Sequence, residues 1–413
     1  MNVPRPPLKP LDDALAELLG FALALDSVES VSTFEADGRV LAQDITASLL
    51  VPPLDNSYMD GYAVRCADVL LAQVQTQGVL PVTQRIPAGS AGAPLAPMSA
   101  ARIFTGAPIP AGADAVVMQE DCEVVEGGAV RIKAVPTLGQ WIRRAGEDVT
   151  PGAVVLSKGE RLTPASLGLA ASIGMDSLPV VRRSRVALFS TGDELVMPGD
   201  VPPEQMKPGT IYNSNRFFLR ALLLRLGCEV SDLGIVPDRL DATINALQQA
   251  AQSHDLILTS GGVSVGEEDH IKPAVQTLGS LHLWHLLMKP GKPFAYGRVQ
   301  NAHFIGLPGN PVSSFITFLL LVRPFLLRLQ GVTQVATKSI AAHAHFTLPR
   351  GDKRREFMRA RRNAAGGLDL FPNQSSGVLT SAVWGDGLVD NPPGQSIAHG
   401  DVVRFIPFSE LLG

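Results

Sequence analysis

The stretch LTSGGVSVGEEDH, residues 258–270, combines two kinds of chemistry. Gly261 and Gly262 can present backbone N–H groups to an anionic oxygen, whereas the acids that follow would repel the same anion. A hard divalent cation such as Mg²⁺ resolves this conflict, because it takes oxygen ligands from carboxylates and phosphate together. The stretch therefore predicts a phosphate site with magnesium, and Asp238 and Asp269 are the expected metal ligands. The alternative for either acid is a helix cap or a first-turn acid.

Turn residues follow four other apolar stretches of the same region. After RVALFS comes TGDEL, after GIV comes Pro237-Asp238, after LHLWHLLM comes KPGKP, and after HFIGL comes PGNPVSS. Each alone is more often a tight turn, a helix start or a solvated loop. If the apolar stretches are neighbouring strands, their ends converge on one rim, where open parallel sheets bind ligands. Lys289 and Lys292 would then add positive charge, and Asn310 or Ser313 would cap the following helix.

The elements that must position these residues alternate between strand and helix over residues 186–331. Apolar strands that alternate with helices favour a mostly parallel sheet covered on both faces. The predicted helices span 214–227, capped by Asn213 or Ser214, then 239–254 and 311–331. A further helix is predicted within residues 10–25.

Four domains are predicted along the chain. Dense turn signals and short strands make residues 51–140 a β-rich domain, and the same pattern returns over 335–413 as a small C-terminal β domain. Residues 186–331 form the α/β domain, and residues 1–50 together with 141–185 form an elongated N-terminal or linker domain.

Composition excludes several function classes. A formal charge of −4 over 413 residues gives no global attraction to nucleic acid or anionic membrane. Three distant cysteines oppose a disulfide framework and a zinc finger. The most apolar run, residues 315–322, is too short to span a bilayer, and acids near the N-terminus oppose a signal peptide. The expectation is a cytoplasmic protein without nucleic-acid or membrane partners, in which the basic stretch 353–362 lines a substrate cleft.

Seven motifs give the chain a specific resemblance. It resembles the molybdopterin molybdenumtransferase family, which includes bacterial MoeA and the E-domain of gephyrin. The motifs are PPLDNSYMDGYAVR (52–65), RIFTGAPIPAGADAVVMQED (102–121), RRAGEDV (143–149), VALFSTGDEL (186–195), SGGVSVGEEDHIK (260–272), MKPGKPFAYG (288–297) and GLPGNPVSS (306–314). The resemblance implies an elongated homodimer with a central, three-layer molybdopterin-binding α/β domain, β-rich N-terminal modules and a C-terminal domain similar to a β-barrel.

The resemblance also implies a transferase reaction. Adenylylated molybdopterin and molybdate are the substrates, the phosphate–AMP bond is cleaved, and AMP and molybdenum cofactor leave, with Mg²⁺ assisting. The implied partners are the adenylylating enzyme and the apo-enzymes that receive the cofactor. An inactive scaffold similar to gephyrin and a pterin-adenylylating enzyme are the alternatives. The sequence leaves molybdate and tungstate undistinguished as substrates.

Site residues are carried over from the family motifs. Molybdate is a tetrahedral dianion, so Lys289, Lys292, Arg355 and Ser376 are its expected ligands. Asp60 and Thr105 are expected across a dimer cleft from the α/β domain. The catalytic set is Asp60, Thr105, Glu194, Asp238, Asp269 and Lys289. The substrate-binding set is Arg143, Asp148, Thr191, Asp193, Ser260, Gly261, Gly262, Ser264, Lys292, Pro308, Asn310, Arg355 and Ser376.

One position departs from the family pattern. His285 stands where family members often have a lysine, four residues before Lys289. A protonated histidine would support an anion site and a neutral one would weaken it. The alternative is a strand residue that alternates outward.

Overall fold

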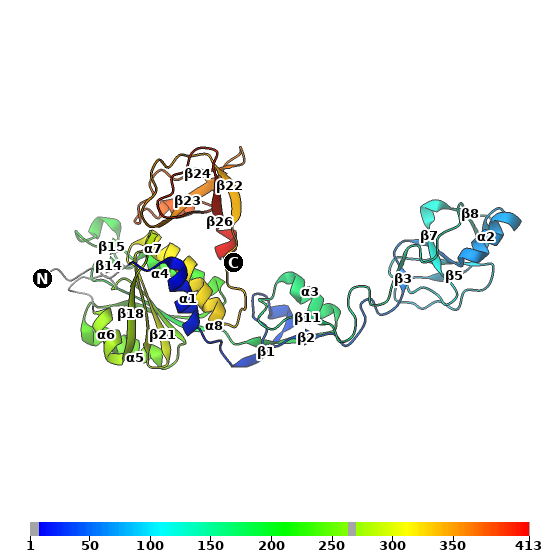
Figure 1. The fold of residues 1–413 in the computed structure, drawn as a ribbon. Helices are drawn as coiled ribbons and strands as arrows, with labels where there is room; N and C mark the ends of the chain where they lie inside the picture. The colour runs from blue at the N-terminus through cyan, green and yellow to red at the C-terminus, as the bar shows by residue number, and fades with distance from the viewer. Residues whose placement is uncertain (1–7, 263–269, 413) are drawn as a thin grey trace.

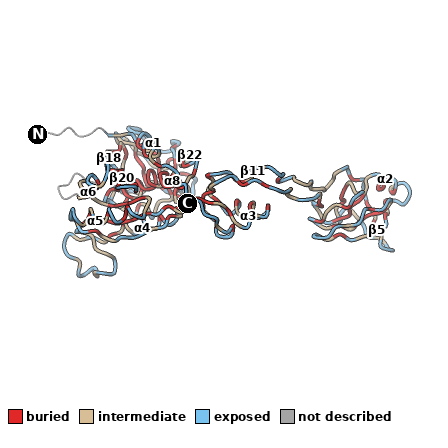
Figure 2. Tube along the Cα trace, turned by 90° about the horizontal axis from the view of Figure 1, so that it is seen from below, coloured by how far each residue is buried: buried red, intermediate tan, exposed pale blue. Residues whose placement is uncertain are grey.

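The computed structural model of the chain describes residues 8–262 and 270–412, so the predicted site residues Ser264 and Asp269 lie outside the described residues. The molecule is elongated, with a β-rich unit at one end and an α/β unit beside a C-terminal β unit at the other (Figure 1). A smaller unit lies between them. Buried residues gather within each unit, and the chain that leads to the β-rich unit is mostly exposed or half-buried (Figure 2).

A six-stranded sheet forms the centre of the α/β unit. Its order is β16 (Glu229–Val236), β13 (Arg185–Thr191), β17 (Leu256–Ser260), β21 (Ala302–Leu307), β20 (Pro293–Val299) and β18 (Gly279–His285). The first four strands are parallel, and β20 is antiparallel to both of its neighbours, so β18 runs in the same direction as the four. Ser260 pairs with Ser190 on one side and with Leu307 on the other, which aligns the strand ends at one edge. The predicted mostly parallel sheet is confirmed.

Helices cover both faces of this sheet. Leu188, Leu258 and Ile305 pack toward α4 (Ser214–Arg225) and a long helix made of α7 (Pro311–Thr317), the π-helical turn η4 (Phe318–Val322) and α8 (Arg323–Leu329). Phe189 and Phe304 pack toward α5 (Leu240–Ala251) and α6 (Ile271–Leu278) on the other face. The three-layer prediction is confirmed.

The long helix Pro311–Leu329 is the single helix, within residues 8–262 and 270–412, with the length and composition of a membrane span. Its most apolar window is 83% buried inside the protein, which is typical of a core helix.

Helix α1 (Leu11–Phe21) belongs to the core of the α/β unit. Its buried residues Leu11, Ala14 and Leu18 share that core with α8, and Lys9 forms a bridge to Leu286. The prediction that residues 1–50 as a whole join residues 141–185 is therefore wrong for this helix. The physical reason is its apolar stripe, which needs a helical partner that the short strands of the middle unit do not supply. The other predicted domain limits stay predictions.

Short strands build the middle and distal units. The middle unit pairs β1 (Val28–Ser32) with β12 (Ser177–Val181) and β2 (Ile45–Thr46) with β11 (Val154–Leu156), beside η1 (Thr33–Glu35) and α3 (Pro164–Ser172). The distal β-rich unit has the strand order β7 (Ala115–Met118), β4 (Gly61–Val64), β6 (Ala100–Ile103), β5 (Val79–Ile86), β9 (Ala129–Ile132) and β8 (Cys122–Val125), with α2 (Cys66–Gln75) and η2 (Gln119–Asp121). At its base β3 (Asn56–Ser57) pairs with β10 (Ile142–Arg143).

The C-terminal unit is a small closed barrel. Its strands are β23 (Arg355–Arg362), β24 (Gly367–Leu370), β22 (Ile340–Ala344), β26 (Val402–Pro407) and β25 (Gly387–Asn391), and β25 pairs back to β23. Closure leaves no open edge among these five strands. Helices α9 (Thr380–Trp384) and α10 (Ser409–Leu412) flank them. The two-residue strand β19 (Met288–Lys289) of the KPGKP segment joins β23 in parallel, so this segment belongs to both units.

Candidate functional site

A cavity of about 420 Å³ lies at the aligned strand ends of the central sheet. We call it the strand-end cavity. Beyond the strands, it is lined by the segment that holds β14 (Leu195–Val196), η3 (Pro203–Gln205) and β15 (Ile211–Tyr212), by the start of α4 and by the start of α7. Six of the predicted residues line it: Thr191, Glu194, Ser260, Gly261, Pro308 and Asn310. Three separate strand ends, those of β13, β17 and β21, therefore contribute to one cavity.

The two glycines of the turn are needed for close approach. Gly261 has φ +95°, and a Cβ there would lie 2.9 Å from the carbonyl oxygen of Thr191. Gly262 has φ +66°, and a Cβ there would lie 2.5 Å from the Ile271 side chain. The Gly261 N–H donates to the Leu307 carbonyl at 3.1 Å, so this N–H completes the sheet and is not available to a phosphate. That part of the predicted phosphate cradle is wrong, because the hydrogen bonds of the sheet continue one residue beyond the last strand residue, Ser260.

Asn215 ties the walls of the strand-end cavity together, and sequence reasoning missed it. Its buried Nδ2 donates to the Ser260 Oγ and to the Gly309 carbonyl oxygen, both at 2.7 Å. Helix α4 holds Asn215 in place, because Asn213 caps that helix by accepting from the Arg216 N–H. The signal in the sequence was that Asn215 is a further polar residue immediately after the two predicted cap residues, Asn213 and Ser214.

Carboxylates gather beside the same edge. The Asp238 N–H donates to the Asp193 carboxylate at 3.3 Å. Burial raises the pKa of Asp238, and the charges of Asp193 and Glu194 raise it further. Within the described ranges, no three histidine, cysteine or acidic side chains are already placed around one metal position. The acids therefore offer hard oxygen donors whose like charges repel one another.

A second cavity, of about 490 Å³, is lined mainly by basic side chains. We call it the basic cavity, and its charged lining residues are Lys292, Arg350, Asp352, Lys353 and Arg354. It adjoins the strand-end cavity through the KPGKP segment, since Pro293 lines the first cavity and Lys292 lines the second. Sequence reasoning missed Arg350 and placed Arg354 only within the basic stretch 353–362, because the loop 350–354 reaches Lys292 only through packing of the barrel on the α/β unit.

Lys289 is held by carboxylates of the barrel. Its ammonium lies 3.1 Å from Glu356 and 3.3 Å from Asp352. The Arg354 guanidinium also binds Asp352, at 2.9 and 3.0 Å. The two predicted lysines thus converge on the same loop, although Lys289 already has anionic partners.

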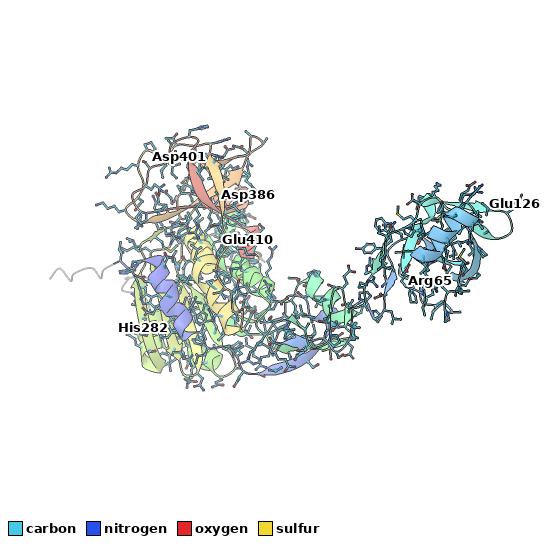
Figure 3. All side chains as sticks on the ribbon, turned by 45° about the vertical axis from the view of Figure 1, so that its right-hand side comes forward. Arg65, Glu126, His282, Asp386, Asp401 and Glu410 are labelled. Atoms are coloured by element: carbon cyan, nitrogen blue, oxygen red, sulfur yellow. The ribbon has the colours of Figure 1, made fainter. Side chains whose placement is uncertain are left out.

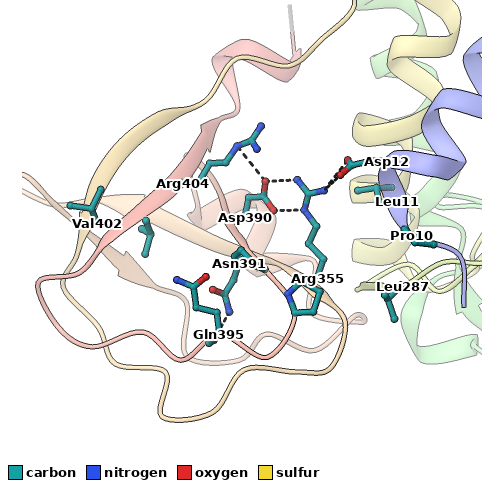
Figure 4. A pocket seen from close by; sticks show the side chains of 13 residues that line it. Pro10, Leu11, Asp12, Leu287, Arg355, Asp390, Asn391, Gln395, Val402 and Arg404 are labelled. Atoms are coloured by element: carbon teal, nitrogen blue, oxygen red, sulfur yellow. Dashed lines mark hydrogen bonds and ion pairs between the residues drawn. The ribbon is translucent and has the colours of Figure 1, made fainter.

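Arg355 faces a different cavity from the one that Lys292 lines. Its guanidinium forms a bidentate pair with Asp390 at 2.6 and 2.7 Å and also binds Asp12 of α1 (Figure 4). The pair with Asp390 is the main reason why the pKa of Arg355 is raised. Successive side chains of β23 point to opposite faces, which separates Arg355 from Glu356 and Lys289. The structure does not bring Arg355 to the lysines, and Arg354 stands there instead.

The N-terminal site residues lie far along the molecule. The Thr105 N–H and hydroxyl both donate to Asp60, at 2.8 and 2.9 Å, and these hydrogen bonds lower the pKa of that carboxyl. Arg143 stacks over the Tyr58 ring at 4.4 Å, and Asp148 is exposed. These residues belong to the β-rich unit and its base, at the opposite end from the central sheet (Figure 1). A single chain does not bring them to the strand-end cavity.

Two remaining predicted positions have definite surroundings. The Ser376 carbonyl oxygen accepts from the Val312 N–H at 2.9 Å, which places Ser376 beside the start of α7. Burial lowers the pKa of His285, and the charges of Lys292 and Lys272 lower it further. These effects favour the neutral form of His285, which would weaken an anion site.

Comparison with known proteins accounts for nearly the whole chain. Residues 9–174 match the MoeA N-terminal region (domain I and II), residues 187–328 a probable molybdopterin binding domain, and residues 341–408 the MoeA C-terminal region (domain IV). Molybdopterin molybdenumtransferase of Haemophilus influenzae is 40% identical over 98% of this chain and 99% of its own length. This chain belongs to the molybdopterin molybdenumtransferase family. The resemblance identified from the motifs is confirmed.

Other members of the molybdopterin molybdenumtransferase family agree. Molybdopterin molybdenumtransferase 2 of Mycobacterium tuberculosis is 39% identical over 88% of this chain and 90% of its own length. A MoeA protein of Pyrococcus horikoshii has a solved structure that is 31% identical, with a TM-score of 0.77, and covers 97% of this chain and 99% of its own. The relation extends to the arrangement of all units and not only to the central domain.

Proposed function

We propose that this chain inserts molybdenum into molybdopterin during molybdenum cofactor biosynthesis. Membership of the transferase family supports the reaction class. The observation that carries the proposal is that two consecutive residues line the two cavities: Lys292 lines the basic cavity and Pro293 lines the strand-end cavity. An oxyanion in the basic cavity and a pterin in the strand-end cavity would then be separated by two adjacent residues, Lys292 and Pro293.

The strand-end cavity is the proposed site of adenylylated molybdopterin. Its volume of about 420 Å³ suits an organic ligand. We propose that the phosphate–AMP bond is cleaved here and that AMP and molybdenum cofactor leave. Cleavage of such a bond develops negative charge on phosphate oxygens, which positive groups stabilise. Lys289, whose ammonium lies 3.3 Å from Asp352 of the basic cavity, is the candidate for that role.

The basic cavity is the proposed site of molybdate. A tetrahedral dianion needs several N–H donors, and Lys292, Arg350, Lys353 and Arg354 provide them. We replace Arg355 by Arg354 in this role, because Arg354 lines the basic cavity, whereas Arg355 lines a different cavity and pairs there with Asp390. Tungstate has nearly the same size and charge and would occupy the same site.

Magnesium fits the acids beside the strand-end cavity. Burial raises the pKa of Asp238, with further contributions from Asp193 and Glu194, and a bound dication would relieve the repulsion among these charges. Asp238 would hold the ion, together with Asp269, which lies outside the described residues. When bound, the ion would neutralise charge on the substrate phosphate. Asp193 and Glu194 would keep water and ion oriented at this edge.

A homodimer is proposed because one chain leaves the site incomplete. Asp60 and Thr105 form a fixed hydrogen-bonded pair, yet they lie at the far end from the central sheet (Figure 1). A second copy in reverse orientation would bring this pair, with Arg143 and Asp148, to the strand-end cavity. An adenylylating enzyme and cofactor-receiving apo-enzymes are the proposed partners, and the cytoplasm is the proposed location.

Turnover of the purified chain tests the proposed function. The chain is incubated with adenylylated molybdopterin, Mg²⁺ and molybdate, and both AMP and pterin-bound molybdenum are measured. We expect both products, and cofactor formation should require molybdate. A folded chain that binds the pterin but yields neither product would overturn the proposal and favour a scaffold.

A further inference from the structure

Asp352 is the single carboxylate among the described residues that line the basic cavity. Its carboxylate engages cations that an oxyanion in this cavity would need. The Arg354 guanidinium donates to Oδ1 at 3.0 Å and to Oδ2 at 2.9 Å, and the Lys289 ammonium lies 3.3 Å from Oδ2. The Asp352 carboxylate thus holds one cation that lines the basic cavity, Arg354, and a neighbouring cation, Lys289.

The loop fixes this carboxylate in place. The Arg354 N–H donates to Oδ1 of Asp352 at 3.0 Å, which closes a tight turn. The Asp352 N–H donates to Glu356 at 3.0 Å. Arg354 is the main cause of a pKa that lies far below the usual range for Asp352, so the group stays ionised at any working pH.

We infer that Asp352 sets the oxyanion affinity of the basic cavity by acting as a built-in competing anion. An incoming dianion either displaces this carboxylate from Arg354 and Lys289 or binds beside it against its repulsion. In both cases binding is weaker than the cations alone would give. When the oxyanion leaves for the pterin, Asp352 returns to Arg354 and Lys289, so these two cations are paired again. The inference rests on the proposed function only for the identity of the anion.

The variant Asp352→Asn isolates the charge. Asparagine keeps the Oδ1 acceptor for the Arg354 N–H, so the turn remains, while the competing charge is lost. Tungstate and molybdate binding to the full-length chain is measured by isothermal titration calorimetry without pterin. We expect the dissociation constant to fall about tenfold, as the loss of one nearby like charge predicts.

Asp386→Asn is the matched control. Asp386 also pairs with an arginine, Arg362, on the same barrel, but it does not line the basic cavity (Figure 3). Its variant should bind the oxyanions like wild type. Asp352→Glu, which keeps the charge, should also stay close to wild type.

A second neutral variant protects the test against a damaged loop. Serine in Asp352→Ser can also accept from the Arg354 N–H, and it should tighten binding in the same way. If both neutral variants are folded and bind the oxyanions within about twofold of wild type, the inference is overturned. Because no pterin is present, tighter binding without turnover would contradict the proposed function alone, and turnover without tighter binding would contradict this inference alone.

Discussion

Single charges at the sheet edge differ in how far their partners already neutralise them. Lys289 lies between Glu356 and Asp352, whereas Lys292 lines the basic cavity three residues later. Asp238 is raised in pKa by its burial and by acidic neighbours. Lys292 therefore supports a prediction about oxyanion binding, and Asp238 supports a prediction about the divalent cation.

Replacing Lys292 by alanine removes one cation from the basic cavity. Because Lys292 is exposed, solvent screens it, and we expect the molybdate concentration for half-maximal turnover to rise about fivefold to tenfold. The pterin requirement should change far less. Lys338→Ala, an exposed lysine outside both cavities, is the control. A shared rise in both requirements would show that Lys292 supports the fold and not the anion.

Replacing Asp238 by asparagine tests magnesium. The change removes a hard ligand while nearly keeping the side-chain shape, so the Mg²⁺ concentration for half-maximal turnover should rise about tenfold. Asp241→Asn is the control, since Asp241 is an exposed acid of the next helix that pairs with Arg239. An unchanged Mg²⁺ requirement would remove Asp238 from the metal site. Asp269→Asn is predicted to behave like Asp238→Asn.

At the scale of elements, strands β13, β17 and β21 must end together for the cavity to form. The turn after β17 achieves this by passing directly over the Thr191 backbone. The core of the same sheet contains a buried histidine, His303 of β21, whose Nδ1 forms a hydrogen bond with the Tyr296 hydroxyl at 2.9 Å. Substitution of Gly261 in the turn and of His303 in the core should each change the free energy of unfolding of the chain.

Gly261→Ala should destabilise the chain and weaken pterin binding. A Cβ 2.9 Å from the Thr191 carbonyl oxygen forces the turn outward, and the positive φ adds strain, together about 1–3 kcal/mol of unfolding free energy. Urea unfolding and pterin fluorescence quenching measure the two effects. Gly366→Ala is the control, because its φ of +82° is similar but nothing lies within 4 Å. Equal losses in both variants would show that close approach at Gly261 is unimportant.

His303 should make stability fall with acid. Burial, with the Arg298 charge, lowers the pKa of His303 to about 4. Between pH 6.5 and pH 4 this histidine is therefore protonated in the unfolded chain but mostly neutral in the folded chain. Stability from this group is complete above pH 6.5 and declines toward pH 4, by about 3 kcal/mol at most. Urea unfolding from pH 7 to 4 should show a shallower decline in His303→Gln than in wild type. The exposed His282 gives the control variant His282→Gln (Figure 3), and equal slopes for all three chains would contradict the prediction.

The whole molecule is too elongated to complete its site alone. The hydrogen-bonded pair of Asp60 and Thr105 stands at one end and the two cavities at the other (Figure 1). The two ends therefore belong either to one cleft that two subunits share or to two unrelated sites, and mixed dimers can distinguish these cases.

Mixing Asp60→Ala chains with Lys292→Ala chains tests the shared cleft. If each cleft takes one residue from each subunit, a heterodimer has one intact cleft. At a limiting molybdate concentration, random mixing should then restore about a quarter of the wild-type rate above the residual rates of the two variants, because half of the dimers are heterodimers with one intact cleft in two. Size-exclusion chromatography and tagged subunits verify exchange. Heterodimers without recovered turnover would mean that each cleft is built from one chain.

The sequence by itself determined the family, the mostly parallel sheet and the ends of its strands. Apolar runs buried on both faces indicate such strands, and turn residues mark where they stop. The cap of α4 was also predictable from the sequence, because Asn213 accepts a hydrogen bond from the N–H of Arg216, only three residues away. Local patterns encode local contacts, so these features needed no tertiary information.

Only the tertiary structure decided which of the predicted groups are available to a ligand. In the folded chain Arg355 pairs with Asp390 and Asp12, whereas Arg354 and Asp352 line the same cavity as Lys292. The Gly261 N–H forms a hydrogen bond within the sheet. The tertiary structure also places α1 on the α/β core. Each outcome depends on strand register or on packing between distant segments, and a shift of one residue along β23 would move Arg355 to the face that Glu356 now occupies. A sequence lists its charges, but the fold determines which of them neutralise one another.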